Sequence, residues 1–358
     1  MRALYFGTYE RDYPRNAEVI ACLRDAGVEV IERHVSVWDE REHKFSFGLR
    51  SAARLARAQV SLLRRSQIDF DVVVVGYPGH FDMSAARRIA AGRPVVFNPL
   101  VSLYDALVVD RGRWRPGSLP ARALRWIDGR AMRAADLVVA ETATHAAFFA
   151  ELAEIPPERV AVCFLGASEP TFGPGWSPSE PFHCLYHGKL IPHHGLETIL
   201  EAATLVPSVR FRIVGAGQLD ALLDQRALPS NVERVGWVER ARIPDELHSA
   251  GCALGIFGTN DRVDRVITNK AFESLACGTP LITADTPAAR ELLVHDESAL
   301  LIPRGDPDAL ASAVQRLAGD ASLAQRLSVG GREAYETHAS RSVLGARWRS
   351  LLEGLVVR

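Results

Sequence analysis

The chain has 358 residues, 47% of them hydrophobic and 24% charged, which is the composition of an ordinary globular protein long enough for two domains. Its net charge of −1 excludes a global attraction to nucleic acid, so we expect no nucleic-acid partner. Residues 41–133 nevertheless hold 17 Lys and Arg against 7 Asp and Glu, a net of +10. This excess suits an anionic substrate or membrane surface, and equally an arginine-rich solvated surface.

The cysteines and the start of the chain bear on location. The five cysteines are scattered and form no C-x-x-C pair, which argues against a disulfide framework or a zinc site. The N-terminus runs directly into a strand-like pattern without a long apolar leader, and no apolar stretch reaches the roughly 20 residues that span a bilayer. We therefore expect a cytoplasmic protein, with peripheral contact to the inner membrane face as a further option.

Short apolar runs alternate with helical patterns along the chain. The runs of the first half are Ala3–Phe6, Val28–Ile31, Val72–Val75, Val95–Phe97, Leu137–Ala140 and Val160–Phe164. Those of the second half are Cys184–Tyr186, Phe211–Val214, Val232–Val235, Ala253–Phe257, Leu281–Ile282 and Ala299–Ile302. Continuous hydrophobicity is typical of strands buried on both faces of a parallel sheet. With helical patterns between the runs, the sequence predicts a doubly wound α/β fold.

A stretch rich in Pro, Gly and Ser at 166–181 separates the two halves. Such composition is typical of an interdomain linker. We expect a Rossmann-like domain at 1–167, a linker at 168–181, a second Rossmann-like domain at 182–336, and a cleft between the two domains. A helix at 337–358 is amphipathic and suited to packing back across the first domain.

Only three of the 42 basic residues are lysines: Lys44, Lys189 and Lys270. Lys189 and Lys270 lie where a strand pattern turns into a helix, and a compact positive charge beside free N–H groups is suited to phosphate. Asn269 is the expected N-cap, and Glu273 shares a helix face with Lys270. Solvated lysines and an ordinary ion pair explain the same residues.

Four glycine-containing turns follow strand patterns in the second half, and in a doubly wound sheet all four could face one crevice. They are His187-Gly188-Lys189-Leu190 with His193-His194-Gly195, Val214-Gly215-Ala216-Gly217, Gly236-Trp237-Val238, and the loop 258–269. Each is weak alone, because glycine punctuates any turn and tryptophan commonly serves packing.

In this order, the second half resembles the nucleotide-sugar domain of retaining GT-B glycosyltransferases of the family 4 type. The resemblance runs from about Leu185 to Glu336 and is most specific in Asn269-Lys270-Ala271-Phe272-Glu273-Ser274-Leu275-Ala276-Cys277-Gly278-Thr279-Pro280. In the first half, Ala140-Glu141-Thr142 and Val162-Cys163-Phe164-Leu165-Gly166-Ala167 are similar to the late first-domain pattern of that family. The first domain would then receive the acceptor and the second a nucleoside diphosphate sugar, with no other cofactor.

The resemblance implies roles for single residues. Lys189 matches the basic residue that faces the donor diphosphate, and Glu273 matches the second glutamate of the E-x7-E motif, which holds the donor ribose. Trp237 and Val238 match the turn beside the base. The diphosphate and donor sugar would be lined by Val266, Ile267, Thr268, Asn269 and Lys270, and the donor site would also include Gly188, His194 and Gly215.

Three positions depart from the family pattern. Arg265 stands where the first glutamate of E-x7-E belongs, and His194 stands where a lysine usually precedes glycine. Asn98 stands where many relatives carry a histidine, which leaves His80 as the nearest alternative and, with Lys189 and Glu273, as our third catalytic candidate. For the acceptor side or cleft we name Gly7, Thr8, His80 and Asp105, with Asp110 as a further carboxylate; solvated loop charges explain the two aspartates equally well.

The expected reaction moves a sugar from the diphosphate to an acceptor hydroxyl, with retention implied by the family. Fixed positive charge and helix N–H groups would stabilise the leaving diphosphate. Because no Asp-x-Asp lies in a convincing loop, we predict no metal. The acceptor could be a glycan, a lipid-linked molecule or a small molecule. A nucleotide-sugar 2-epimerase and a non-catalytic sugar- or nucleotide-binding protein are the alternatives.

One segment of the first half is basic and amphipathic. Its arginines are accompanied by apolar residues at helical spacing: Arg50, Arg54, Arg57, Arg64 and Arg65 with Leu55, Val60, Leu62 and Leu63. Such a helix can lie on anionic lipid. A surface helix packed on its own sheet is the competing interpretation.

Overall fold

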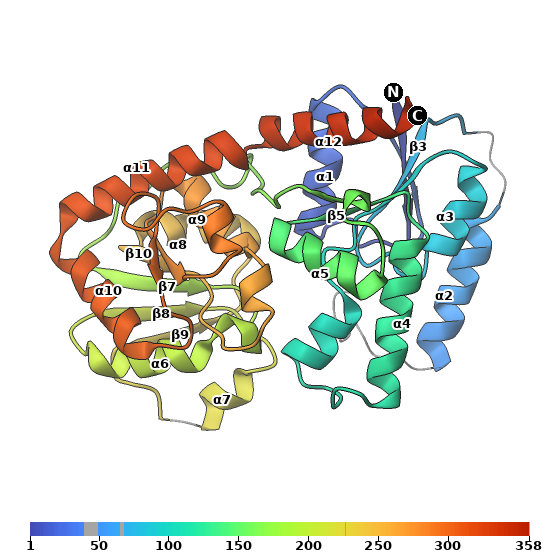
Figure 1. Ribbon diagram of the computed structural model, residues 1–358. Helices are drawn as coiled ribbons and strands as arrows, with labels where there is room; N and C mark the ends of the chain where they lie inside the picture. Colours follow the sequence, from blue (N-terminus) through green and yellow to red (C-terminus); the bar gives the residue numbers. More distant parts are fainter. Residues whose placement is uncertain (39–48, 65–67, 226, 358) are drawn as a thin grey trace. The chain divides into compact units, whose positions relative to one another are not determined.

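The computed structural model describes residues 1–38, 49–64, 68–225 and 227–357 (Figure 1). Lys44 and Arg65 lie outside these residues. Contacts divide the chain into two compact units. Unit 1 holds Met1–Val108, Arg113–Phe164 and Arg341–Arg358, and unit 2 holds Val109–Gly112 and Leu165–Ser340. No helix among the described residues is long and apolar enough to cross a membrane.

Unit 1 is a doubly wound parallel sheet in the order β2-β1-β3-β4-β5-β6. Its strands are β1 (Arg2–Gly7), β2 (Glu29–His34), β3 (Val72–Val75), β4 (Val95–Phe97), β5 (Leu137–Ala140) and β6 (Val160–Val162). Its helices are α1 (Pro14–Asp25), α2 (Leu49–Leu62), α3 (Met83–Ala90), α4 (Leu119–Arg133), α5 (Ala143–Ala153) and α12 (Arg341–Val356), with a π-helical turn at Asp105–Asp110.

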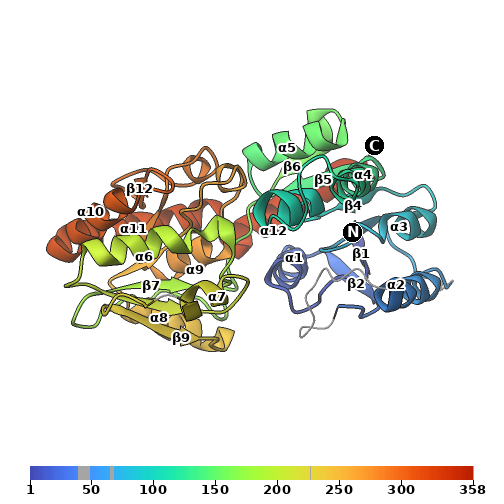
Figure 2. The ribbon, with the colours of Figure 1, turned by 90° about the horizontal axis from the view of Figure 1, so that it is seen from below.

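Alternate residues of these strands enter two separate apolar clusters, one on each face of the sheet. Val73 and Val75 face a cluster that includes residues of α2 to α5, whereas Val72 and Val74 face a cluster that includes α1 and α12. The last helix, α12, lies alongside α1 (Figures 1 and 2), and Trp348 of α12 is 1% exposed. Burial on both faces explains why the strands have no polar alternation.

Unit 2 repeats the architecture with the strand order β12-β11-β10-β7-β8-β9, again all parallel. Its strands are β7 (His183–His187), β8 (Arg210–Val214), β9 (Val232–Gly236), β10 (Cys252–Leu254), β11 (Leu281–Ala284) and β12 (Leu300–Ile302). Its helices are α6 (Leu196–Leu205), α7 (Asp220–Gln225), α8 (Ile243–Ser249), α9 (Asn269–Cys277), α10 (Pro307–Gly319) and α11 (Ala321–His338). Helices α6 and α8 lie on opposite sides of β7 and β8 (Figures 1 and 2).

From β7 the chain adds strands toward one edge of the sheet, and from β10 it adds them toward the other edge. The reversal point therefore lies between β7 and β10. In open α/β sheets, ligands bind outside the carboxyl ends of the strands at such a point. The corresponding point of unit 1 lies between β1 and β3. The predicted doubly wound fold, with two Rossmann-like domains, is confirmed.

Candidate functional site in unit 2

Three glycine turns stack at the carboxyl ends of β7, β8 and β9. Gly188, Gly215 and Gly236 all have positive φ, at 124°, 145° and 78°. A Cβ on Gly215 would overlap the carbonyl oxygen of Gly188, and the Gly215 N–H donates to Gly236 O at 2.6 Å. Only glycine lets the backbones approach so closely, which leaves an open rim of peptide groups beside the strand ends.

Lys270 is buried at the reversal point of the sheet. Its Nζ lies 3.8 Å from the Tyr186 ring centroid, 3.1 Å from His194 Nδ1 and 3.4 Å from Gly255 O, so it stands between the ends of β7 and β10. The residue is 3% exposed. Burial holds the pKa of Lys270 well below its usual range, although the charge of Glu273 works in the opposite direction.

His194 is the second predicted cation of this site, and it is electrically different from the lysine of the family pattern. Its Nδ1 lies 2.7 Å from both Tyr186 OH and Lys189 O. Burial, and then the neighbouring charge of Lys270, hold the pKa of His194 well below its usual range. His194 is therefore harder to protonate than an exposed histidine, and it faces Lys270 as a hydrogen-bonding group.

Helix α9 begins beside Lys270. Its N-cap is Thr268, in extended conformation, with no capping hydrogen bond from the side chain. The expectation that Asn269 is the N-cap is wrong by one residue, because Asn269 already has the helical conformation of the first turn. N–H groups of the first turn consequently lack a side-chain partner from the cap, which is the arrangement that favours anions at a helix N-terminus.

Glu273 lies one turn further along α9 and is held by two basic residues. Its Oε2 lies 2.9 Å from His187 Nε2, and its Oε1 lies 2.7 Å from Arg240 Nη2. Burial alone would raise the pKa of Glu273, but the hydrogen bond from His187 and the charge of Arg240 outweigh it and lower that pKa. An ionised carboxylate is thus fixed in a buried position, with lone pairs beyond the two it uses here.

The remaining predicted donor residues divide into exposed and buried ones. Lys189 and Trp237 are exposed, with Trp237 at 70%, and Val238 is partly buried. Val266 and Ile267 are buried, and Val266 belongs to a small apolar cluster with Ile256, Val263 and Ala284. Val266 and Ile267 are therefore buried under the loop, whereas Lys189 and Trp237 present their side chains to solvent.

Arg265, the departure from the E-x7-E pattern, is half-buried at the end of a short 3-10 turn, Val263–Arg265. Its neighbour Arg262 is 7% exposed and lowers the pKa of Asp110. The loop that enters α9 is thus basic on the side where the family pattern has a glutamate.

Asp110, named above as a first-half carboxylate, lies in unit 2. Its Oδ1 accepts from the His193 backbone N–H at 2.9 Å and from Asn260 Nδ2 at 3.1 Å, and its Oδ2 lies 2.9 Å from His193 Nδ1. Burial opposes ionisation, but the hydrogen bond and charge of His193 lower the pKa of Asp110. The carboxylate therefore fixes the turn that leads to His194 and is not a solvated loop charge.

In unit 1, His80 is buried in a network that holds a loop. Its Nδ1 lies 2.8 Å from Pro78 O, and its Nε2 lies 3.2 Å from Asp128 Oδ1. The side chains of His80 and Asp128 are both 0% exposed. Asp128 also accepts from Ser102 Oγ at 2.6 Å and from the N–H groups of Leu103 and Tyr104 at 2.9 Å.

Gly7 and Thr8 form a tight turn after β1, at the reversal point of unit 1. Thr8 donates from its N–H and Oγ1 to Asp82 Oδ2 at 2.7 and 2.9 Å, and a Cβ on Gly7 would overlap the same oxygen. Burial raises the pKa of Asp82. Asp105 is completely buried at the start of the π-helical turn. Asp105 and the Gly7–Thr8 turn therefore do not form an exposed cluster.

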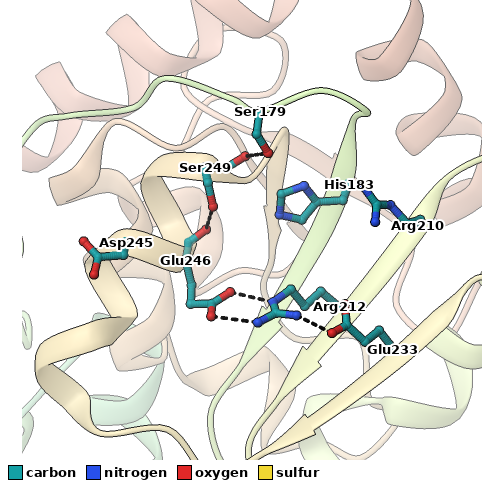
Figure 3. A pocket seen from close by; sticks show the side chains of 8 residues that line it. All are labelled: Ser179, His183, Arg210, Arg212, Glu233, Asp245, Glu246 and Ser249. Atoms are coloured by element: carbon teal, nitrogen blue, oxygen red, sulfur yellow. Dashed lines mark hydrogen bonds and ion pairs between the residues drawn. The ribbon is translucent and has the colours of Figure 1, made fainter.

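A cavity of about 350 Å³ lies at the other end of the unit 2 sheet (Figure 3). Arg212 is fully engaged there, with donors to Glu246 at 2.6 and 2.9 Å and to Glu233 at 2.5 Å. His183 and Arg210, the first residues of β7 and β8, also line it. The cavity is therefore at the amino ends of the strands, away from Lys270 and Glu273.

Three residues of these networks were missed by sequence reasoning, namely Arg240, Asp82 and Asp128, and His187 was noted only as part of a turn. Arg240 lies four residues after the turn glycine Gly236, which is the signal that could have pointed to it. Within the described residues, no three His, Cys, Asp or Glu side chains gather as a metal site would require.

Two family descriptions together match most of the chain. Residues 6–166 match the glycosyl transferase 4-like domain, and residues 181–320 match glycosyl transferases group 1. The chain belongs to the GT-B glycosyltransferases. The order of the two matches is that of units 1 and 2, and the site around Lys270 and Glu273 falls in the group 1 half of this glycosyltransferase.

Characterised relatives are similar over different lengths. The lipopolysaccharide core biosynthesis glycosyltransferase LpsD of Rhizobium meliloti is 28% identical over 49% of this chain and 51% of its own length. The GDP-mannose-dependent alpha-mannosyltransferase of Mycobacterium tuberculosis is 28% identical over 80% of this chain and 72% of its own. The chain thus spans about half the length of LpsD.

Solved structures share the fold of this GT-B member. Sucrose-phosphate synthase from Thermosynechococcus elongatus superposes with a TM-score of 0.78 at 16% identity, covering 99% of each chain. HepE of Anabaena, in complex with UDP-glucose, gives a TM-score of 0.71 at 16% identity, covering 99% of this chain and 100% of HepE.

Proposed function

We propose that this protein transfers a hexose from a nucleoside diphosphate sugar to an acceptor hydroxyl. The observation that carries the proposal is the pairing, on one short helix of unit 2, of a buried lysine with a buried ionised glutamate at the reversal point of the sheet. The family of the chain supports the reaction class, and a relative that uses GDP-mannose and a fold neighbour that holds UDP-glucose support a nucleotide sugar as co-substrate.

The diphosphate is proposed to lie against the start of α9, where Lys270 and the first-turn N–H groups meet it. Exposed Lys189 reaches the same anion from the end of β7. As the bond to the sugar breaks, negative charge grows on the leaving diphosphate, and charges already fixed in place stabilise it without reorganising. Lys270 is costly to bury as a cation in the free protein, so a nearby dianion raises its pKa and strengthens the attraction.

Glu273 is proposed to accept hydrogen bonds from the ribose hydroxyls. His187 and Arg240 already hold one lone pair on each carboxylate oxygen, which fixes the orientation of the carboxylate before the donor arrives. Trp237, exposed beside the turn after β9, is proposed to stack on the nucleotide base, with Val238 next to it.

Retention at the anomeric carbon, the lack of a metal requirement and a cytoplasmic location belong to the same proposal. Fixed cations and helix N–H groups supply the charge stabilisation that a metal provides elsewhere. The five cysteines are free and buried, and the Cys184 and Cys252 sulfurs lie 3.5 Å apart without a bond, which fits a reducing compartment. The acceptor is proposed to be a glycan, a lipid-linked molecule or a small molecule.

The test is donor binding and turnover with UDP-glucose and GDP-mannose, for the wild type and for Lys189→Ala and Glu273→Gln. Arg210→Ala and Glu333→Gln are matched controls, because Arg210 is an exposed cation at the opposite end of the same sheet and Glu333 is exposed on α11. We expect both site variants to lose donor affinity or turnover and both controls to keep them. Wild-type behaviour of both site variants would refute the assignment.

Product analysis separates the alternatives. Conversion of the donor into its isomer without acceptor would identify a 2-epimerase. Affinity for a free sugar without affinity for UDP or GDP would identify a non-catalytic sugar-binding protein.

A further inference from the structure

The segment 111–133 is unusually basic, and all of it from Arg113 onward belongs to unit 1. It holds seven arginines and a single acidic residue, Asp128. Asp128 is 0% exposed and is engaged by His80 and by the loop 102–104, so it neutralises none of the surface charge. The segment lies entirely within the described residues, and its exposed charged residues are all arginines.

Helix α4 in this segment turns one face inward and the other to solvent. Ala121, Leu124 and Met132 are buried, and Met132 packs in the apolar cluster under the sheet. The outer side shows two large apolar residues, Leu119 at 79% and Trp126 at 61% exposed. They are seven residues apart, hence about two turns along one stripe of the helix.

Arginines surround these two apolar residues. Arg122, Arg125 and Arg130 of α4 and Arg115 of the preceding loop are all exposed. The Arg130 guanidinium lies 5.6 Å from the Trp126 ring centroid, and Arg130 Nη2 donates to Ser84 Oγ at 3.3 Å. We call Arg115, Leu119, Arg122, Arg125, Trp126 and Arg130 the α4 face.

Helix α2, the basic amphipathic segment singled out from sequence, behaves differently. Leu62 is 1% exposed and lies in the cluster under the unit 1 sheet, with Leu63 packed against it. Gln59 donates to the buried Asp82 at 2.6 Å. Although Val60 is 64% exposed, the C-terminal end of α2 packs on its own domain, which supports the interpretation of a surface helix packed on its sheet.

We propose that the α4 face docks on the surface of an anionic lipid bilayer. An indole and a leucine side chain are suited to the boundary between headgroups and acyl chains, where tryptophan is enriched. The arginines around them complement anionic headgroups, and no exposed carboxylate of the segment opposes them. A nucleic acid would match the charge but would leave Leu119 without an apolar partner.

The proposal is tested by co-sedimentation of the full chain with vesicles of phosphatidylcholine alone and with 30% phosphatidylglycerol. We expect binding to the anionic vesicles at low salt, weakened by high salt, and none to phosphatidylcholine alone. Arg122→Gln with Arg125→Gln should weaken binding about fivefold for each arginine neutralised. Leu119→Ser with Trp126→Ser should lower it further, and all these positions are exposed enough to leave folding intact.

The matched control is Arg57→Gln with Arg64→Gln, an equal loss of charge on and just beyond α2. It should leave vesicle binding unchanged, and a blue shift of tryptophan fluorescence on binding should disappear in Trp126→Phe. Binding that survives the α4 variants, or that is lost in the α2 control, would overturn the proposal, as would tighter binding to duplex DNA than to anionic vesicles. UDP and GDP binding should be the same in all these variants, so failure here leaves the proposed transfer reaction untouched.

Discussion

Helices α9 and α4 both carry basic side chains that we assign to anionic ligands, but in opposite surroundings. Helix α9 buries Lys270, 3% exposed, under a tyrosine ring and beside an ionised glutamate. Helix α4 keeps its arginines in water around two exposed apolar side chains. A buried cation has a high desolvation cost, so its interaction with a single anion placed beside it is strong. Exposed cations each attract anions weakly, their contributions add, and salt screens them. The first arrangement suits a specific ligand and the second an extended surface.

The largest effect is expected at the carboxylate that completes the α9 site. Glu273→Gln removes the buried anion that His187 and the partly exposed Arg240 contact, so we expect a loss of about 2 kcal/mol in the free energy of unfolding. With the ribose contact also lost, donor-dependent turnover should fall by roughly 100-fold or more. Urea unfolding and steady-state kinetics measure the two effects. Wild-type stability and wild-type turnover in this variant would contradict the role that we assign to Glu273 and α9.

A comparable loss of stability is expected in unit 1, from the buried pair of His80 and Asp128. His80→Gln and Asp128→Asn should each cost about 2 kcal/mol, because each removes one contact from a fully buried polar network. If His80 only fixes the loop 102–104, both variants should lower acceptor affinity together with stability. A selective loss of turnover in His80→Gln, with the stability of Asp128→Asn lowered as predicted, would show instead that His80 contacts the reacting groups.

Lys270→Met should separate binding from stability. We expect donor affinity to fall by about tenfold or more, as a desolvated charge–phosphate contact is lost. Stability should move in the other direction. Burial lowers the pKa of Lys270 in the folded state, so the unfolded chain binds the proton more readily. Below the folded-state pKa, burial of the protonated lysine therefore lowers the free energy of unfolding by its full amount. This loss disappears as the pH rises toward the pKa of the unfolded state. The variant should therefore gain most over wild type at low pH in urea unfolding, and a variant less stable than wild type at every pH would contradict this account.

The protonation of Lys270 predicts a smaller effect on donor binding. UDP should bind more weakly as the pH rises through the pKa of Lys270, since the neutral amine attracts the diphosphate less. Binding should also take up protons, which calorimetry in buffers of different ionisation enthalpy detects. Lys270→Met should lose this uptake, and an unchanged uptake in the variant would assign it to another group.

The smallest effect is expected on the stability of α4. Arg122→Gln with Arg125→Gln should change the free energy of unfolding by no more than about 0.5 kcal/mol, because both side chains are solvated. A larger loss would show that these arginines are structural and would weaken the contrast with α9.

The strands were largely predictable because buried parallel strands carry a continuous apolar signal. Val72–Val75, Val95–Phe97 and Leu137–Ala140 have the expected bounds. The run Ala253–Phe257 was too long: the strand ends at Leu254, and the Gly255 carbonyl is left free to receive Lys270. Hydrophobicity alone continues past this point and gives no sign of the change.

The site was predictable in its backbone and less so in its charges. Glycine turns and the start of α9 follow from local spacing, but the partners of Glu273 come from β7 and from the turn after β9, far away in sequence. Burial likewise could not be foreseen: Lys189 and Lys270 stand in similar local patterns, yet one is exposed and the other lies under Tyr186. The same holds for α2 and α4, which pack on the same face of the unit 1 sheet but differ in how much of their outer apolar surface is exposed.

The most direct measurement is calorimetric titration of UDP into the wild type, Lys270→Met, Glu273→Gln and the control Arg210→Ala. The account predicts saturable binding that both α9 variants weaken by tenfold or more and that Arg210→Ala leaves unchanged. Equal affinity in all four proteins, or a loss confined to Arg210→Ala, would contradict the placement of the donor site at the carboxyl ends of β7 and β10.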